Sequence, residues 1–340
     1  MANFSTSNLL TAQSMLAKKY AAPEMRMKPC PAFDLLTGNS NVLIESAETL
    51  RTREDRPIEA HLLARTKRAS GAGRTHNHTG TFDDSGKITL SWTTKSDVTS
   101  ISLKLLDKSV FDFDTVLANK LEQCAMNILE DKETEAIAYL RAQRATQQPT
   151  LKGATFNAAT DAVEVSAQEI EAKRFFARVR SVMKQNYFGR NLDIVGDSNI
   201  AVSAEYLAAQ GAGNATNWGY QFQGLNIVES VELNDANYDA AALVMPAGST
   251  AALNWIPKQN REGYGDYNSY NGGYGVFRFM GYTFALHGYA QRSDTSGSNG
   301  ATQDVTMEFE LSLDSSYNKS PLLYTTDRTD SVIVEFGQLS

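Results

Sequence analysis

Two histidines one residue apart, His76 and His78, have the spacing in this sequence that most suggests metal binding. Imidazoles at positions i and i+2 can share one face of a strand and so approach a common ion. No cysteine, glutamate or third histidine follows at ligand spacing, and only Asp83 and Asp84 lie near the pair. We therefore interpret both histidines as solvent-facing residues of a polar loop, and we expect neither a metal nor a cofactor.

The signatures of common enzyme classes are also missing from the sequence. No Gly-x-Ser-x-Gly elbow is present to hold a nucleophilic serine. Neither the P-loop pattern nor Gly-x-Gly-x-x-Gly after a strand is found. Carboxylate pairs occur without any recognisable surrounding pattern, although an active site built from scattered residues would leave no such mark. We expect a protein that is not an enzyme.

A cluster of basic residues precedes and enters the histidine-bearing segment. Its members are Arg51, Arg53, Arg56, Arg65, Lys67, Arg68 and Arg74. Such a cluster is compatible with nucleic-acid binding. Glu54, Asp55 and Glu59 are interleaved with it, which favours ion pairing to protein instead. We therefore interpret the cluster as a candidate contact between protein subunits.

The composition is that of an ordinary globular protein, with 42% hydrophobic residues and a formal net charge of −7. A length of 340 residues allows one large domain or two modest ones. No run of 18 apolar residues indicates a membrane span, and the N-terminus lacks the pattern of a secretion signal. Cys30 and Cys124 stand in unrelated settings, so we expect both to be reduced packing residues.

The stretch from Ser109 to Gln147 is predicted to form one long helix, because neither proline nor glycine interrupts it. Its apolar residues recur at steps of three and four, and Ser109 with Asp112 resembles a capping box. This apolar stripe along one side of the helix is interrupted where every side of the helix becomes polar. The candidate contact residues in this break are Glu130, Asp131, Glu133 and Glu135. We predict that the break faces a neighbouring subunit or the outer surface, and not the core.

The segments before this helix are predicted to reach outwards. Residues 1–50 indicate an arm, in which a short amphipathic helix over 8–20 docks either on its own domain or on another subunit. Residues 56–107 indicate a long hairpin whose return arm alternates apolar and polar residues from Ile88 to Leu105. Its tip, residues 69–86, is polar and rich in glycine and is expected to project.

The second half of the chain is predicted to contain a compact α/β unit followed by antiparallel strands. A second helix is expected over 170–188, a strand at 241–245 that leads into a short helix, and strands over 276–291, 303–313 and 331–336. Between them lies a loop rich in tyrosine, asparagine and glycine. Its candidate contact residues are Tyr264, Tyr267 and Tyr270.

Taken in this order, the chain resembles the major capsid proteins of tailed bacteriophages, which have the HK97-type fold. The segment 242–253 looks like the axial-domain segments of that family; its sequence is Ala-Leu-Val-Met-Pro-Ala-Gly-Ser-Thr-Ala-Ala-Leu. The resemblance implies an α+β fold in five parts: an arm (1–50), an extended hairpin loop (51–107), a peripheral domain with a spine helix (108–165), an axial domain (166–275), and strands ending the chain (276–340). The resemblance covers essentially the whole chain. It rests on the order of the predicted elements, their lengths and the kinds of residue in them.

The resemblance further implies a shell subunit that forms hexamers and pentamers of an icosahedral head around double-stranded DNA, without sequence-specific contacts to it. The hairpin would overlap a neighbouring subunit, and a loop at 211–217 or 260–275 would face the capsomer centre. A separate scaffolding protein and a portal are expected partners, and the virion, assembled in the host bacterial cytoplasm, is the expected location. Two alternatives are an encapsulin-like nanocompartment shell and, from another class, a monomeric enzyme or carbohydrate-binding domain.

Overall fold

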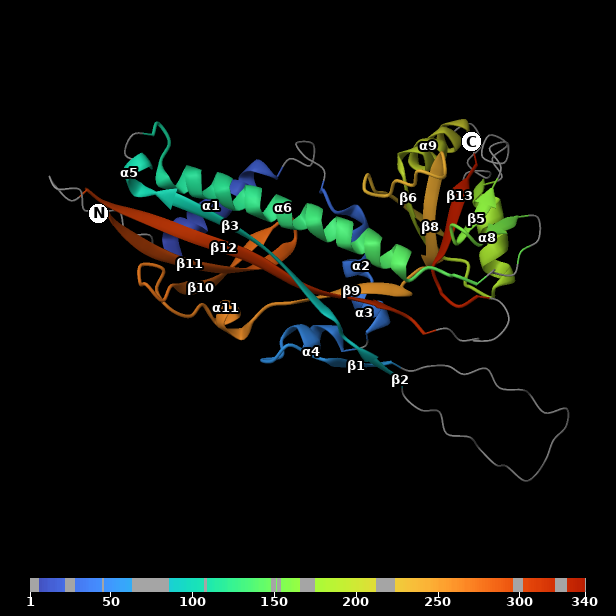
Figure 1. The fold of residues 1–340 in the computed structure, drawn as a ribbon, viewed down its shortest axis with the longest axis horizontal. Coiled ribbons are helices and arrows are strands. Elements are labelled where there is room, and N and C mark those ends of the chain that lie inside the picture. Colours follow the sequence, from blue (N-terminus) through green and yellow to red (C-terminus); the bar gives the residue numbers. More distant parts are fainter. Residues whose placement is uncertain are drawn as a thin grey trace, which may run out of the picture.

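A computed structural model describes most of the chain. The described residues are 6–21, 28–44, 46–62, 86–106, 109–147, 151, 154–165, 175–211, 224–295, 302–321 and 329–339. Within these ranges, the subunit is elongated, with a long helix-and-sheet unit at one end and a smaller α/β unit at the other (Figure 1). No helix among these residues has the length and apolar character needed to cross a membrane.

The longer unit consists of one helix lying along a five-stranded antiparallel sheet. The helix is α6, Phe113–Ala142, whose 30 residues reach about 45 Å at 1.5 Å per residue. The strand order is β10-β11-β12-β3, with β9 also pairing with β12. The strands are β3 Trp92–Ser102, β9 Thr250–Trp255, β10 Gly273–Phe279, β11 Tyr282–Thr295 and β12 Thr302–Lys319. The predicted long helix is therefore confirmed, somewhat shorter than expected.

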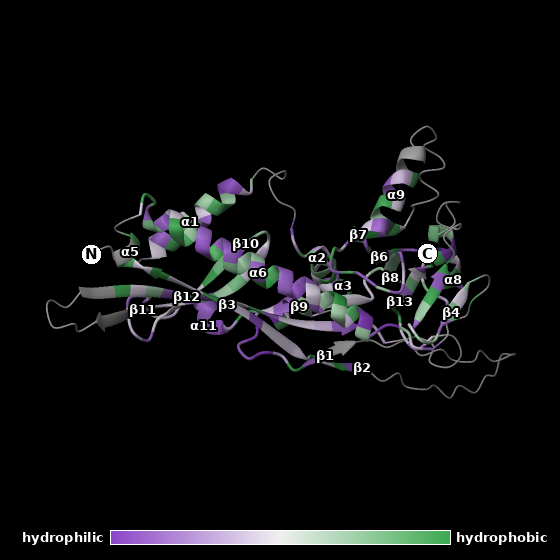
Figure 2. Ribbon diagram, turned by 45° about the horizontal axis from the view of Figure 1, so that its top comes forward, coloured by the Kyte–Doolittle hydropathy of each residue, from purple (hydrophilic) through white to green (hydrophobic). Residues whose placement is uncertain are grey.

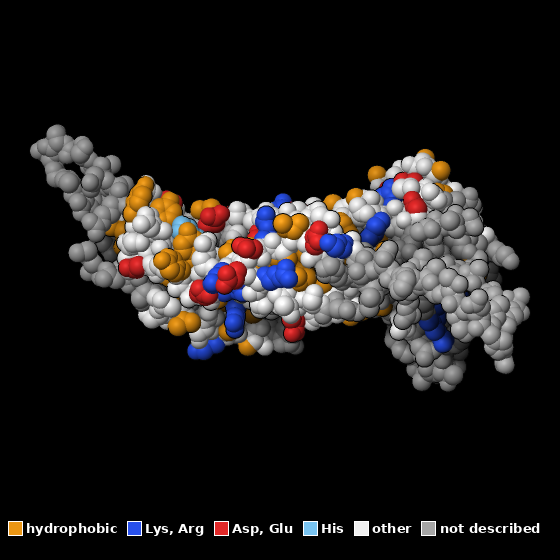
Figure 3. Space-filling model, turned by 90° about the horizontal axis from the view of Figure 1, so that it is seen from below, with side chains coloured by type: hydrophobic (Ala, Val, Ile, Leu, Met, Phe, Trp, Pro, Cys, Tyr) orange, Lys and Arg blue, Asp and Glu red, His pale blue; other side chains and the backbone are white. Residues whose placement is uncertain are grey.

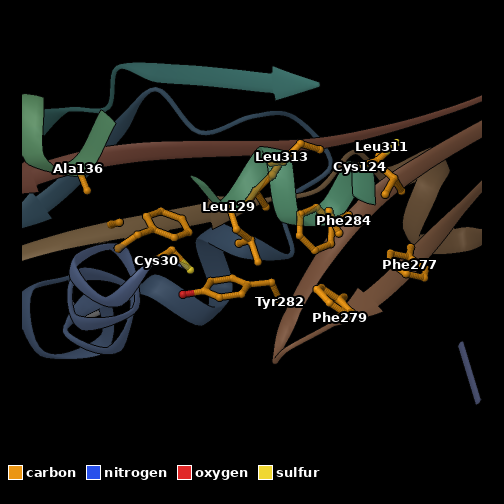
Figure 4. Packing of buried hydrophobic residues seen from close by; sticks show 14 of the residues in the cluster. Cys30, Cys124, Leu129, Ala136, Phe277, Phe279, Tyr282, Phe284, Leu311 and Leu313 are labelled. Atoms are coloured by element: carbon orange, nitrogen blue, oxygen red, sulfur yellow. The ribbon is translucent and has the colours of Figure 1, made fainter. Parts of the chain in front are cut away.

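The core of this unit forms where α6 meets the sheet, and the predicted stripe of α6 supplies one side of it. Leu117, Leu121, Cys124 and Ile128 are all buried, while hydrophilic and hydrophobic residues alternate along the helix (Figure 2). Figure 4 shows rings of the β10–β11 hairpin, including Phe284, packing towards the helix. Both cysteines are buried and unbridged, and burial raises the pKa of each thiol to about 12. They pack as predicted.

The arm helix α1, Thr6–Lys19, lies on its own domain, which decides between the two predicted positions. Leu9, Ala12 and Leu16 are buried in the same cluster as α6. The ammonium of Lys19 forms an ion pair of 2.7 Å with Glu122 of α6, and Asn8 donates a hydrogen bond of 2.6 Å to Asp114. Helix α1 thus belongs to the long unit.

The smaller unit is a six-stranded mixed sheet in the order β4-β5-β13-β8-β6-β7. Its strands are β4 Thr155–Asn157, β5 Ala162–Val165, β6 Leu192–Gly196, β7 Leu225–Glu229, β8 Ala240–Pro246 and β13 Val334–Gln338. Helices α8, Phe175–Gln185, and α9, Ser198–Gly211, accompany the sheet (Figure 1). Aromatic residues of α8 pack on Phe336 of β13, so the end of the chain completes this unit.

Short elements connect the two units and the hairpin. The helices are α2 Pro31–Gly38, α3 Ser40–Leu43, α4 Ala47–Arg51, α5 Leu103–Leu106 and α11 Lys258–Glu262. Strands β1, Glu59–Leu62, and β2, Gly86–Thr89, pair with each other in a separate two-stranded sheet. A small cluster that includes Leu50, Ala60 and Leu253 fixes its base to β9. The tip at 69–86, including both histidines, lies outside the described residues except for Gly86.

Four local predictions are wrong, and in the first two pairing with β12 decides the structure. The predicted return arm is only β2, since β3 leaves the hairpin and pairs with β12. The helix expected after residue 246 is strand β9, which also pairs with β12. The single strand expected at 276–291 is two strands joined at Met280 and Gly281, which both have positive φ angles. Asp112, and not Ser109, is the N-cap residue of α6.

Candidate assembly surfaces

The polar break of α6 is divided between solvent and core. Glu130 and Asp131 are exposed, and Glu135 is partly exposed, as a contact surface requires. Lys132 and Glu133 are buried, with 0% and 1% of their surface exposed. The prediction that the whole break faces outwards is therefore wrong for Glu133, because its own chain covers it.

Glu133 is buried because three donors converge on its carboxylate. The backbone N–H groups of Ala32 and Phe33 donate to it at 3.1 and 2.9 Å, and the hydroxyl of Ser230 donates at 2.5 Å. Ala32 and Phe33 are in the first turn of α2, whose free N–H groups favour a negative partner. Burial raises the pKa of Glu133, while these hydrogen bonds oppose that shift. This one carboxylate joins the spine helix, the arm and the loop after β7.

The neighbouring Lys132 joins α6 to the sheet. Its ammonium donates to the backbone carbonyl of Thr93 on β3 at 3.1 Å and to Glu135 at 2.8 Å. Burial lowers the pKa of Lys132, and Glu135 opposes that shift. The polar break is thus mostly an internal polar network that fixes the helix on its sheet, with Glu130 and Asp131 left on the surface.

A charged joint connects the end of α6 to the α/β unit. The guanidinium of Arg144 lies 3.1 Å from the carboxylate of Glu335 on β13, and Arg141 lies 3.7 Å from it. Arg141 also contacts Asp235 at 3.4 Å. Glu335 is 1% exposed, so burial raises its pKa, and both arginines act against that rise. Local sequence patterns do not reveal this joint, because Arg144 and Glu335 are almost 200 residues apart.

The basic cluster is only partly within the described residues. Arg65, Lys67, Arg68 and Arg74 lie outside them. Arg51 is half-buried and donates to Ser40, whereas Arg53 and Arg56 are exposed, and Arg56 lies 3.9 Å from Asp314. Basic and acidic side chains are interspersed over the face seen from below (Figure 3). This part of the surface is mixed in charge.

The tyrosine loop belongs to the long unit, between α11 and β10. Tyr264 and Tyr270 are 71% and 84% exposed, as the predicted contact role requires. Tyr267 is only 8% exposed, because its ring lies against Gly273 and Gly275, where a side chain would collide with it. The prediction for Tyr267 is therefore wrong. In Figure 1, the loop region near α11 lies far from α8 and α9.

Apolar surface that the sequence did not suggest lies at the start of α6. Val110 and Phe111 are 98% and 64% exposed, and Leu10 of α1 is 60% exposed. Beside them, α1 and α6 form a largely apolar groove of about 340 Å³ that includes Met15 and Val116. Exposed apolar surface of this kind is typical of protein–protein contacts.

Comparisons with known proteins find similarity in structure only. No family model matches the sequence. No curated protein matches it either. A solved chain of Mycobacterium phage Adephagia is similar over 100% of this chain and 99% of its own, with a TM-score of 0.48 and 10% identity.

Two further similar structures are described as capsids. The capsid structure of cyanophage P-SCSP1u is similar over 85% of this chain and 86% of its own, with a TM-score of 0.47 and 12% identity. The capsid of Ralstonia phage GP4 is similar over 94% of this chain and 96% of its own, with a TM-score of 0.44 and 12% identity.

Proposed function

We propose that this chain is the major capsid protein of a tailed phage, a non-enzymatic subunit that assembles into hexamers and pentamers of an icosahedral shell. The order of its elements supports the proposal. An arm helix packs on a 30-residue helix, that helix lies along a five-stranded sheet, and a six-stranded α/β unit follows at the far end. This is the order that the resemblance to the HK97-type fold implies.

The separate β1–β2 sheet supports a role in assembly. Its strands pair over only four residues each, and within the described residues they join neither of the larger sheets. A two-stranded ribbon is marginally stable in water and has unpaired edges, both of which a partner surface would correct. Ile58, next to β1, is 71% exposed. We infer that the hairpin overlaps a second copy of the chain.

The remaining partners follow from the proposed shell. The subunit would enclose double-stranded DNA without sequence-specific contacts, in keeping with its net charge of −7. A separate scaffolding protein and a portal would take part in assembly in the bacterial cytoplasm, and the finished subunit would reside in the virion.

Replacing residues 63–85 with Asn-Gly tests the role of the hairpin. Leu62 and Gly86 are directly paired, so a two-residue turn can close the strands in the same register. We expect a folded variant that remains unassembled when its mass is measured by light scattering, whereas the wild type forms capsomers or larger particles.

The matched control closes a different hairpin in the same way. Thr295 and Thr302 are also directly paired, so Asn-Gly in place of residues 296–301 shortens the β11–β12 connection. This control is expected to assemble like the wild type. Normal particles from the 63–85 variant would contradict the overlapping role of the hairpin.

A further inference from the structure

Charges in the α/β unit are separated along the sequence. Residues 173–190 contain six basic residues and no acidic ones, and residues 191–257 contain seven acidic residues and no basic ones. The change of sign falls at the start of β6. Because the chain as a whole is mixed in charge, this separation distinguishes the unit from the surface around α4 and α11.

Three of these basic residues line a cavity at the amino end of β6. This basic cavity, of about 570 Å³, lies between the end of α8 and the turn before β6, and Arg180, Lys184 and Arg190 line it. No acidic residue lines it among the described residues. Lys184 and Arg190 are exposed and make no ion pair within the described part of the chain. The cavity therefore presents cationic groups to a partner from outside.

Four exposed acidic residues lie at the opposite end of the same strands, whereas Asp193, near the start of β6, is buried. Glu229 pairs in register with Gly196 at the carboxyl end of β6, and Asp239 immediately precedes β8, which runs antiparallel to β6. Glu205 on α9 and Glu232 after β7 are also exposed. We call these four residues the acidic end. Five residues of β6 separate it from the basic cavity by roughly 16 Å along the strand.

Exposed apolar residues accompany both charged regions. Tyr187, beside the basic cavity, is 55% exposed. Near the acidic end, Val202, Tyr206 and Val231 are 64%, 59% and 81% exposed. Apolar groups within a polar rim are typical of protein interfaces. Opposite charges on two different faces of one unit fit a head-to-tail contact between identical copies, the kind of contact that forms a ring when the rotation between copies closes.

We infer that the basic cavity of one subunit receives carboxylates from the acidic end of a second copy, so that α/β units associate head to tail. This inference rests on the proposed function and names the surfaces through which the copies would meet. A second copy fits the cavity better than nucleic acid does, because a long polyanion would also have to approach the four exposed carboxylates of the acidic end.

Two charge-reversed variants test the inference. One carries Lys184→Glu with Arg190→Glu, and the other carries Glu232→Lys with Asp239→Lys. Each variant alone presents like charges across the contact, so we expect the concentration needed for association to rise at least about tenfold. Mixing the two in equal amounts restores opposite charges, and association is expected to return. Circular dichroism and thermal unfolding show whether each variant is folded.

The control Arg278→Glu reverses an exposed charge on β10 of the long unit and is expected to associate normally. Normal association of both folded double variants would overturn the inference while leaving the proposed function intact. Loss of association without recovery on mixing would also overturn it, as would a loss confined to the basic variant together with weaker DNA binding. A wild type that never associates would instead refute the proposed function.

Discussion

Replacing Arg144 with methionine is expected to destabilise the subunit by about 3 kcal/mol at neutral pH, the lower end of the usual effect of leaving a buried charge without its partner, because Arg141 remains 3.7 Å from Glu335. Arg144 is the nearest cation to Glu335, at 3.1 Å, and Glu335 is 1% exposed. Methionine keeps much of the side-chain volume but supplies no charge. The free energy of unfolding of the unassembled subunit, measured with urea, gives the size of the effect.

The destabilisation should diminish in acid. Burial raises the folded-state pKa of Glu335 above 4.5, and losing Arg144 removes a group that opposes the rise. Between the unfolded and folded pKa values the folded protein binds more protons, so stability falls as pH rises through that window. The Arg144→Met variant is therefore expected to recover part of its lost stability as the pH falls towards 4.5.

The double variant Arg144→Met with Glu335→Leu is the matched control. Removing both charges leaves no buried carboxylate unpaired, although the partly exposed Asp161 also loses Arg144. Most of the lost stability should therefore return, and the part of the pH dependence that Glu335 causes should disappear. A double variant as unstable as Arg144→Met at every pH would contradict the role assigned to this ion pair.

Replacing Glu133 with glutamine is expected to cost about 2–4 kcal/mol of stability, because a buried donor left without an acceptor loses more than one hydrogen bond is worth. Three donors converge on this carboxylate, from Ala32, Phe33 and Ser230. Glutamine keeps the shape but turns a donor NH₂ group towards at least one of them. Urea unfolding measures the change.

The control for this prediction lies three residues earlier on the same helix. Glu130 is exposed, so Glu130→Gln changes the same charge and is expected to alter stability by no more than about 0.5 kcal/mol. Equal urea midpoints for the two variants would show that Glu133 does not hold α2 against α6.

Local pattern was sufficient to predict the elements whose apolar residues all meet one surface. The stripe of α6 is an example, since Leu117, Leu121, Cys124 and Ile128 are buried as its periodicity required. Strand β9 shows where local pattern fails. Its segment Thr-Ala-Ala-Leu, residues 250–253, is short and apolar enough for either a helix or a strand. It forms a strand because it pairs with β12, more than 50 residues later in the chain.

Burial of single polar residues was not predictable for the same reason. Glu133 stands in a run of charges that reads as solvent-exposed, and its donors come from about a hundred residues away. In the sequence, Tyr267 is one of three similar loop tyrosines, and only the folded structure shows that Gly273 and Gly275 provide the space that buries its ring. The charge separation around residue 190 is visible in the sequence. Only the strand directions place its two parts at opposite ends of the sheet.

The most direct test of the proposed function is an electron micrograph of the purified full-length protein, alone and together with a scaffolding protein. A shell subunit should appear as rings of five or six copies or as closed icosahedral particles. Particles of 37.3 kDa only, at every protein concentration and ionic strength and with scaffold present, would contradict the proposal.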